Sequence, residues 1–459
     1  MKEGLTRQRA TRPLTRVSES FAEFFGLEVA GSAVLLLAAI VALVLANSGL
    51  SEQYHEFWKI EIGFAVGDWQ FSETLLHWID DGLMAMFFFV VGLEMKREFI
   101  AGELSTPRKA ALPILAAIGG MVVPALVYTA INTGGSGASG WGVPMATDIA
   151  FALGVLALLG SRAPAGLKVF LTALAIADDI GAVLVIAVFY TEQIVLGWLA
   201  MGIVLMLVLV ALNFFDVDEP LPYFLVASMI WFAFLHSGVH ATIAGIAVAL
   251  AIPARARTQP LEFVSWTRLK LQEIEDVDVP GAHVLDDPAQ QNCALEIRER
   301  ARHVAAPLQR LEHTLLPFTT FGILPLFALA NAGVTLVDYD LGRLLLEPVT
   351  LGVFFGLLVG KPVGIAAMSW LAVRFGAADL PAGVRWRHIV GAGLLAGIGF
   401  TMSLFISNLA FRATVLQAEA KLGIMLTSIA AGILGYLFLR VFGDRAEGSQ
   451  AGATKQQVS

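Results

Sequence analysis

Two adjacent carboxylates lie at the midpoint of Leu167–Tyr190, an apolar stretch long enough to cross a membrane. A transmembrane helix needs about 20 mostly apolar residues, and each charge at its centre costs roughly 2.5–3.5 kcal/mol on insertion scales. Carboxylates can hold either protons or a dehydrated cation. Asp178 and Asp179 therefore predict a site that binds a cation and exchanges it for protons. The competing interpretation is a neutral, hydrogen-bonded pair that serves only helix packing.

The two aspartates are not equivalent. Neighbouring side chains on an α-helix diverge by about 100°, so both cannot point straight at one ion. Lys361 lies at the centre of a second apolar stretch, VFFGLLVGKPVGIAAM, where an unpaired ammonium would lose its proton or find a carboxylate. We expect Asp179 to face a cytoplasmic cavity as the principal ligand and Asp178 to pair with Lys361. The residues leave open whether Lys361 is a structural counter-ion or releases a proton when sodium arrives.

A third acid, Asp148, lies in WGVPMATDIAFALG, where Pro144 removes a backbone donor and Thr147 offers a hydroxyl. We expect this helix to break near its middle and expose dipole ends, the positive one offset by Asp148 and the negative one by Lys361. The glycine-rich stretch GAGLLAGIGFTMSLFI is the matching candidate for a break. Paired, interrupted helices in corresponding halves indicate the midplane site of a transporter. Close helix packing at the glycines is the competing interpretation.

The composition requires a membrane to surround these stretches. Of 459 residues, 57% are hydrophobic and 15% are charged, whereas soluble domains carry about 25% charged residues. We predict an all-α polytopic membrane protein with twelve transmembrane helices, both termini cytoplasmic because Lys and Arg concentrate on that side. The seventh and eighth runs are short, and a steep tilt or a partly re-entrant path stays open. The runs are Gly26–Ala46, Leu75–Phe99, Arg108–Ile131, Val143–Leu159, Leu167–Tyr190, Ile194–Phe215, Leu221–Leu235, Gly238–Ile252, Leu311–Val334, Val349–Val373, Ile389–Phe411 and Leu422–Phe442.

The remaining segments divide into tails, a hairpin and an insert. We expect cytoplasmic tails at 1–25 and 443–459 around a membrane domain at 26–442. Residues 57–72, FWKIEIGFAVGDWQFS, alternate apolar and polar types around Gly67-Asp68, which predicts a small β-hairpin on the outer face; an irregular loop is the alternative. Residues 253–310 form a cytoplasmic insert, by default a solvated loop. Its last part predicts a charged helix, Ala294–Leu316, kinked at Pro307.

Charged residues also gather at the ends of the membrane runs. One group lies near the cytoplasmic end of the second run, and two histidines flank a Ser-Gly between the seventh and eighth runs. Such a patch can attract cations or sense pH, since histidine titrates in the physiological range. An ordinary solvated helix end is the competing interpretation. Nothing in the sequence indicates nucleic-acid binding, and a single cysteine, Cys293, excludes both an internal disulfide and a multi-thiolate zinc site.

These motifs are together similar to one family. The chain resembles the NhaA family of bacterial sodium/proton antiporters over nearly all of its membrane part. The likeness rests on long strings in the family's order, namely GLMAMFFFVVGLEMKRE, PRKAALPILAAIGGMVVPAL, ATDIAFALGVLALLGSR, LTALAIADDIGAV, SGVHATIAG, ILPLFALANAGV, GKPVGI and GIGFTMSLFI.

The resemblance implies a twelve-helix fold in which helices 3–5 and 10–12 are inverted repeats and helices 4 and 11 are discontinuous where they cross. It implies that Asp178 and Asp179 bind sodium or lithium in competition with protons, that Thr147 and Asp148 support the crossing, and that Lys361 is essential. It further implies electrogenic exchange without a cofactor, a homodimer formed through the outer hairpin, and a multi-pass location in the bacterial inner membrane. Residues tied to pH activation would be Glu94, Arg97, Glu98, His240 and Glu312, grouped at the cytoplasmic mouth.

Departures from the family pattern concern regulation. The insert at 253–310 and the tail after Arg440 are long, and the loop after the sixth run is acidic. Leu316 stands where some relatives carry a histidine one turn after Glu312. These differences leave the details of pH control open and do not touch the ion site.

Three other functions fit part of the pattern. A sodium-coupled symporter would need a larger polar cavity for an organic solute. An intramembrane aspartyl protease would need its two acids on facing helices as a dyad, whereas here they are adjacent on one helix. A passive channel would conduct sodium without a proton counterflux. An antiporter that exports sodium for sodium and pH homeostasis explains the residues best.

Overall fold

The computed structural model describes residues 13–67, 69–191, 193–215, 217, 219–256, 258–277, 288–335, 340–411 and 415–443. Several sequence predictions therefore lie outside the described residues. They are those for 1–12 of the N-terminal tail, Asp68 of the hairpin turn, Asp216 and Asp218 of the acidic loop, 278–287 of the insert, and 444–459 of the C-terminal tail.

The described chain is almost entirely helical, and most helices are long and apolar. Eight helices are long and apolar enough to cross a membrane, or up to ten if each of two bent helix pairs counts as one span. The eight spans lie in α1 (Pro13–Ala46), α3–η1–α4 (Leu75–Ala101), α5 (Pro107–Ile131), α7 (Ala165–Phe189), α8 (Leu196–Phe214), α13–η5–α14 (Pro307–Asn331), α16–η6–α17 (Pro348–Arg374) and α20 (Val415–Phe442). The seventh and eighth expected runs fall on the shorter helices α9 (Pro220–Ser237) and α10 (Ala241–Ala251).

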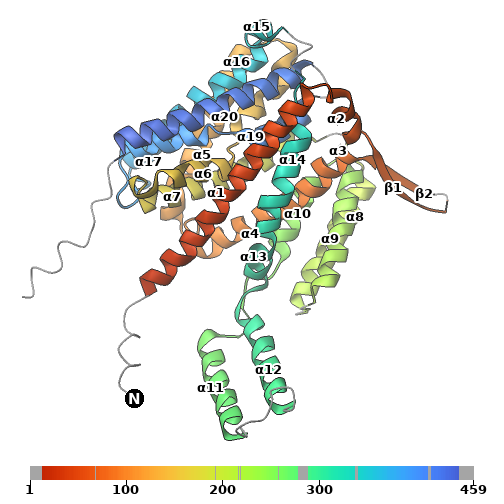
Figure 1. Cartoon of the computed structure of the whole chain (residues 1–459), viewed down its shortest axis with the longest axis vertical. Helices are drawn as coiled ribbons and strands as arrows, with labels where there is room; N and C mark the ends of the chain where they lie inside the picture. The colour runs from red at the N-terminus through yellow and green to blue at the C-terminus, as the bar shows by residue number, and fades with distance from the viewer. Residues whose placement is uncertain are drawn as a thin grey trace, which may run out of the picture.

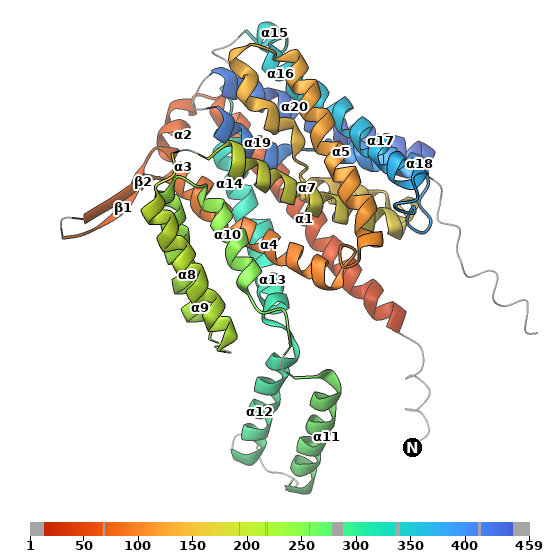
Figure 2. The same ribbon diagram turned by 180° about the vertical axis from the view of Figure 1, so that it is seen from behind.

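Two helix pairs are bent at a short break. In the first, η2 (Ser136–Met145) and α6 (Ile149–Leu158) meet at 46°. In the second, α18 (Trp386–Ala396) and α19 (Phe400–Ala410) meet at 48°. The first break falls at Thr147-Asp148 and the second within the glycine-rich stretch before Thr401, where the sequence predicts them. The residues at both breaks are buried, among them Thr147, Asp148 and Ile398, and the helices that carry them are part of the helical body in Figures 1 and 2.

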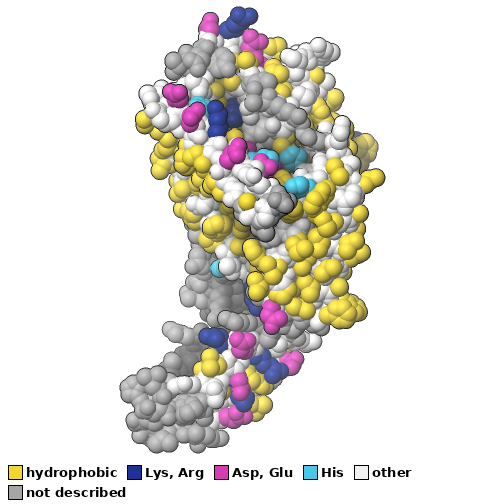
Figure 3. All heavy atoms as spheres, turned by 90° about the vertical axis from the view of Figure 1, so that its right-hand side faces the viewer, with side chains coloured by type: hydrophobic (Ala, Val, Ile, Leu, Met, Phe, Trp, Pro, Cys, Tyr) yellow, Lys and Arg dark blue, Asp and Glu magenta, His cyan; other side chains and the backbone are white. Residues whose placement is uncertain are grey.

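The outside of the helical body is apolar over a broad band. Large side chains such as Leu207, Phe214, Leu221 and Phe224 on α8 and α9 are mostly exposed. Figure 3 views this face and shows hydrophobic side chains over much of its area, with charged side chains gathered above and below. Contiguous apolar patches of this extent mark interaction or membrane surfaces. The band is therefore the lipid-facing surface of an integral membrane protein.

A two-stranded antiparallel sheet extends from one end of the body (Figure 1). Strands β1 (Glu61–Val66) and β2 (Trp69–Thr74) pair with Val66 opposite Trp69, and Gly67 takes the left-handed φ of +62° that the tight turn requires. The strands follow the short helix α2 (Ser51–Trp58). The indole N–H of Trp78 in η1 donates to the carbonyl of Ile62 at 2.9 Å, which fastens the hairpin to the membrane helices.

The insert is not a solvated loop where the structure describes it. Its residues form helices α11 (Pro260–Val277) and α12 (Pro288–Val304), which lie side by side and project from the body (Figures 1 and 2). Lys270 of α11 pairs with Glu296 of α12 at 3.3 Å and with Glu273, and its hydrogen bonds to both carboxylates raise the pKa of Lys270. The expected kink at Pro307 is also wrong. Proline lacks an N–H and favours the first helical position, so α12 ends before it and α13 begins at it.

The described helices form two groups, and the largest apolar core joins these groups, since it contains residues of α1, α4 and α14 together with α5, α7, α16 and α19. A second core joins residues of α5, α6, α7, α17, α18 and α20, and we call these helices, with α16 and α19, the core body. Smaller cores join α4 with α8, α9, α10 and α13, and we call these, with α1, η1 and α14, the scaffold body. Within the core body α5 and α17 approach closely, since a Cβ added to Gly119 would lie 2.2 Å from the carbonyl oxygen of Gly364. A Cβ added to Gly393 of α18 would lie 2.9 Å from Pro362, so the helix that carries Lys361 also lies beside the second bent pair.

Candidate ion-binding site

Asp178 and Asp179 lie at the middle of α7, and both side chains are almost completely buried, with 1% and 3% exposure. Asp178 Oδ2 accepts a hydrogen bond from the Lys361 ammonium at 2.8 Å. The pairing expected from the sequence is therefore present. The Oδ1 atoms of both aspartates have no hydrogen-bond partner among the described residues. These two oxygens are the unused acceptors of the site.

Lys361 owes its position to the proline that follows it. Pro362 has no N–H and its ring clashes with the carbonyl of the preceding turn, which widens a helix locally. The residues just before Lys361, Gly356–Gly360, form the π-helical turn η6, a feature that is frequent at functional sites. The ammonium also donates to the carbonyl of Met145, the last residue of η2. Lys361 thus places its charge at the negative end of the η2 dipole.

Asp148 joins the starts of two half-helices. Its Oδ1 accepts from the N–H of Phe151 at 3.2 Å and caps α6. Its Oδ2 accepts from both the N–H of Thr401 at 3.0 Å and the Thr401 hydroxyl at 2.6 Å, at the start of α19. One carboxylate therefore lies at the positive ends of two helix dipoles.

Hydrogen bonds to backbone carbonyls connect the two broken helices. The N–H of Asp148 donates to the carbonyl of Ile398 at 2.7 Å, and the Thr147 hydroxyl donates to the carbonyl of Ala396 at 3.0 Å. The Ser403 hydroxyl donates to the carbonyl of Val143 at 2.8 Å. These three bonds satisfy polar groups of one broken helix with groups of the other, as a low-dielectric interior requires. The two broken helices form one polar assembly beside the aspartates.

The sequence reasoning did not assign site roles to Thr401 and Ser403. A signal was available, because Thr401 lies only two residues after Gly399, the last glycine of the glycine-rich break. A hydroxyl near a helix break is a candidate donor to whatever caps the opposite break. Without the crossing geometry, nothing in the sequence selects Asp148 as the acceptor for Thr401.

The charges of this assembly leave one acid without a cationic neighbour in direct contact. Asp148 is balanced by two helix starts, and Asp178 by Lys361. Asp179 has no ion pair among the described residues, although it lies next to Asp178 on α7. A buried carboxylate without a cation neutralises itself by binding a proton or a metal ion. The geometry can therefore hold either protons or a small cation at Asp179 and Asp178.

Four of the five residues expected at the cytoplasmic mouth come together. Arg97 Nε lies 3.1 Å from Glu312 Oε1, and Arg97 also lies 3.5 Å from Glu98. Glu94, one turn before Glu98 on α4, lies within electrostatic range of Arg97 and Glu312. These four side chains join α4 to α13.

His240 is not part of that group. Its Nδ1 lies 3.7 Å from Asp81 Oδ1, at the opposite end of the α3–η1–α4 run and about 20 Å along the helix axis from Glu94. Helices α4 and α10 pack in parallel, since Gly245 contacts Ala85 while Ala249 contacts Gly92. The first residues of both helices therefore meet, and His240 precedes α10. Its expected location at the cytoplasmic mouth is wrong.

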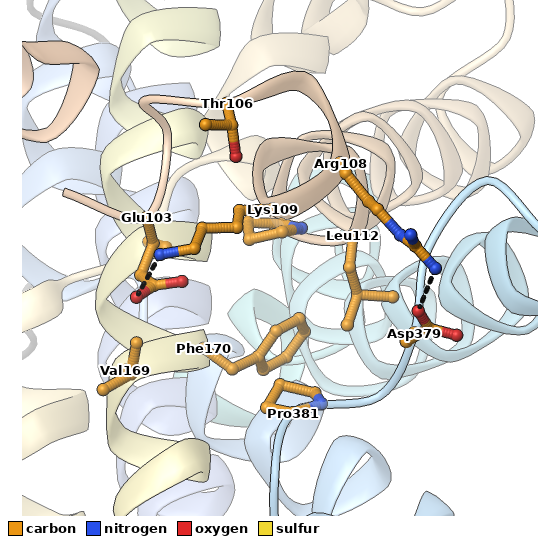
Figure 4. A pocket seen from close by; sticks show the side chains of 11 residues that line it. Glu103, Thr106, Arg108, Lys109, Leu112, Val169, Phe170, Asp379 and Pro381 are labelled. Carbon is orange, nitrogen blue, oxygen red and sulfur yellow. Dashed lines mark hydrogen bonds and ion pairs between the residues drawn. The ribbon is translucent and has the colours of Figure 1, made fainter. Parts of the chain in front are cut away.

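A separate pocket lies beside α5 and α7 but does not reach the aspartates. It has a volume of about 370 Å³, and its lining includes Phe170 and Ala173 of α7. Figure 4 shows two ion pairs at this pocket, Lys109 with Glu103 at 3.8 Å and Arg108 with Asp379 at 3.0 Å. Both pairs are largely exposed, so each contributes little free energy. The pocket offers an exposed aspartate for comparison with the buried ones.

The double contact of Thr401 with Asp148 gives a prediction. Thr401→Val removes the hydroxyl but keeps the shape and the backbone N–H. A hydrogen bond to a charged group contributes about 1.5–3 kcal/mol, so the cation-exchange rate in proteoliposomes should fall by about tenfold or more. Thr401→Ser keeps the donor and should stay within about twofold of the unmodified protein. An equal loss in both variants would show that the methyl packing, not the hydrogen bond, matters.

Known sequences match this chain over most of its length. The family described as Na+/H+ antiporter 1 matches residues 22–439. The Na(+)/H(+) antiporter NhaA of Oleidesulfovibrio alaskensis is 49% identical over 94% of this chain and 96% of its own length. NhaA of Acidithiobacillus ferrooxidans is 49% identical over 91% of this chain and 96% of its own. NhaA 1 of Saccharophagus degradans is 46% identical over 95% of this chain and 94% of its own.

Proposed function

The chain belongs to the NhaA family of Na+/H+ antiporters, and we propose that it binds its cation at Asp178 and Asp179 and exchanges it there for protons. As a member of this family it is an integral membrane transporter and not an enzyme. The observation that carries the proposal is the buried Asp178–Lys361 pair beside Asp179, with one unused oxygen on each aspartate. Sodium and lithium are small cations that prefer such oxygen ligands, and no cofactor is needed.

Competition for the same oxygens couples the two fluxes. When Na+ reaches the aspartates, Asp179 must release its proton, and Asp178 is drawn away from Lys361. Because a buried ammonium without a carboxylate is costly, cation binding disfavours the charged lysine as well. The exchange is electrogenic when more protons enter than sodium ions leave. Asp148 and Thr147 hold the crossing on which this geometry depends.

The membrane arrangement follows from the same membership. We assign twelve spans, counting the two bent pairs as the discontinuous fourth and eleventh helices and α9 and α10 as short seventh and eighth helices. Spans 3–5 and 10–12 are the inverted repeats. Supporting this, each repeat supplies one break to the crossing. Both termini lie in the cytoplasm of a bacterial inner membrane, and the insert projects into the cytoplasm.

Two further assignments concern assembly and control. The β1–β2 hairpin lies on the outer face and joins two copies of the chain in a homodimer. The group formed by Glu94, Arg97, Glu98 and Glu312 lies at the cytoplasmic mouth and adjusts transport to pH. His240 belongs to the outer end instead, where it contacts Asp81.

Transport by the purified protein tests this function directly. Proteoliposomes loaded with a pH-sensitive dye should show proton movement opposite to an imposed Na+ or Li+ gradient, and no response to K+. Valinomycin with K+ should accelerate the exchange, because it removes the opposing membrane potential of an electrogenic cycle. Sodium flux without proton movement would contradict antiport and indicate a channel. Sodium uptake that requires an organic solute would indicate a symporter.

A further inference from the structure

A polar cluster joins the core body to the scaffold body at the end of α19 opposite Thr401. Asn331 at the end of α14 donates to Asp80 Oδ1 in η1 at 2.7 Å. Asn408 of α19 contacts both of them, with its Nδ2 2.6 Å from Asn331 Oδ1 and 3.4 Å from Asp80 Oδ2. Gln417 of α20 donates to Asn408 Oδ1 at 2.6 Å. Lys421, one turn further along α20, attracts the Asp80 carboxylate electrostatically.

The hydrogen bonds made by Asn408 cross the boundary between the two bodies. Asp80 and Asn331 belong to the scaffold body, whereas Asn408, Gln417 and Lys421 belong to the core body. The only side chain that hydrogen-bonds to both bodies in this described cluster is Asn408. The cluster lies at the end of α3–η1–α4 that carries the hairpin, which is the outer end in the proposed orientation.

An aromatic layer separates this cluster from the ion site. Phe405 of α19 packs against Phe88 of α4 with ring centroids 5.6 Å apart, and against Phe327 of α14 at 6.3 Å. All three rings are almost fully buried. Phe405 lies one turn after Thr401 and one turn before Asn408, so α19 passes in order from the ion site through the aromatic layer to the polar cluster. Two layers of side chains, the polar cluster and the aromatic rings, therefore fill the boundary between the bodies on the outer side of the ion site.

We propose that Asp80, Asn331, Asn408 and Gln417 form an outer latch that holds the transporter closed to the outside and opens in each cycle. The inference rests on the proposed function, since an antiporter must expose Asp178 and Asp179 to each side in turn. Thr401 and Asn408 are on one helix, about 10 Å apart along its axis. Any movement of the crossing relative to the scaffold body carries Asn408 with it and breaks its bonds to Asp80 and Asn331.

The latch makes a prediction about access from outside. Met84 lies one turn deeper than Asp80 on the same helical run and is fully buried. In a Cys293→Ser background, Met84→Cys in right-side-out vesicles should react slowly with a membrane-impermeant thiol reagent. Asn408→Asp removes the amide that donates to Asp80 and Asn331 and places two carboxylates together. The labelling rate should rise by about tenfold, because hydrogen bonds to charged groups contribute the most free energy. Asp80→Asn, a neutral and isosteric change, should raise it by about threefold or more.

A charge swap distinguishes a latch from general loosening. Asp80→Asn combined with Asn408→Asp restores one carboxylate and one amide across the boundary and should return labelling close to the starting rate. Asn132 is the matched control. It is buried and donates to the carbonyls of Tyr128 and Pro348, both within the core body. Asn132→Asp should therefore leave Met84→Cys labelling unchanged.

Three results would overturn the latch. They are unchanged labelling in Asn408→Asp and Asp80→Asn, a swap that labels as fast as either single variant, and an equal rise in Asn132→Asp. Size-exclusion profiles identify any variant that does not fold, and the remaining variants still decide the question. Labelling reports access rather than ion binding. A failure of the latch would therefore leave the assignment of Asp178 and Asp179 intact, and loss of that assignment would not alter the labelling.

Discussion

Proteoliposomes that carry Asp179→Asn are expected to show no sodium-driven proton movement, and those that carry Asp178→Asn are expected to behave the same way. Asparagine matches the shape of aspartate but neither binds a transported proton nor balances the charge of Na+. Placing a cation in a buried site without its carboxylate costs several kcal/mol. Exchange should therefore fall by at least about a hundredfold. Dequenching of a trapped pH dye after addition of Na+ measures the loss.

The two variants should differ in stability although both are inactive. Asp178→Asn removes the partner of a buried ammonium, whereas Asp179→Asn leaves the Lys361–Asp178 pair intact. Thermal unfolding of the purified variants should show a lower Tm for Asp178→Asn alone. Asp379→Asn is the matched control, because Asp379 forms an exposed ion pair with Arg108 and should affect neither measurement. Normal exchange in both Asp178→Asn and Asp179→Asn would disprove the ion-site assignment.

The features of this site that can be predicted from the amino-acid sequence are those that the apolar surroundings of the membrane require. A charge inside an apolar stretch must have a partner, and few charges are available there, so the amino-acid sequence is enough to pair Lys361 with one of the two central aspartates, and the structure selects Asp178. Helix breaks are similarly predictable, because Pro144 and the glycines before Thr401 weaken the backbone ladder at definite points. In both cases the physical cost of an unsatisfied group in hydrocarbon limits the possibilities.

The features that cannot be predicted from the amino-acid sequence are those that depend on which helices pack against each other. His240 looks equally suited to either end of the protein until the parallel packing of α4 with α10 places it beside Asp81. The contact of Thr401 with Asp148 depends on where two breaks cross. The pairing of α11 with α12 in the insert, through Lys270 and Glu296, likewise depends on which helices meet. Apolar periodicity identifies a helix but not its neighbours.

Lys361→Met is expected to lower the stability of the folded protein more than any other single change at the site. Both Lys361 and Asp178 have 1% exposure, and removing one partner of a buried ion pair costs about 3–5 kcal/mol. The substitution also removes the hydrogen bond that the ammonium donates to the carbonyl of Met145, the last residue of η2. Thermal unfolding in detergent should show the lower stability as a reduced Tm at the same protein and lipid content.

The double variant Lys361→Met with Asp178→Leu separates the charge from the packing. Replacing a whole buried ion pair by apolar side chains of similar volume is often neutral or stabilising by about 1–4 kcal/mol. The double variant should therefore recover most of the lost Tm while sodium-driven proton movement stays absent. If the decreases in Tm of the two single substitutions simply add in the double variant, each side chain contributes to stability by packing and not through its ion pair. Recovery without transport would show that the pair contributes little net stability, so that its place in the membrane is explained by the exchange of ions.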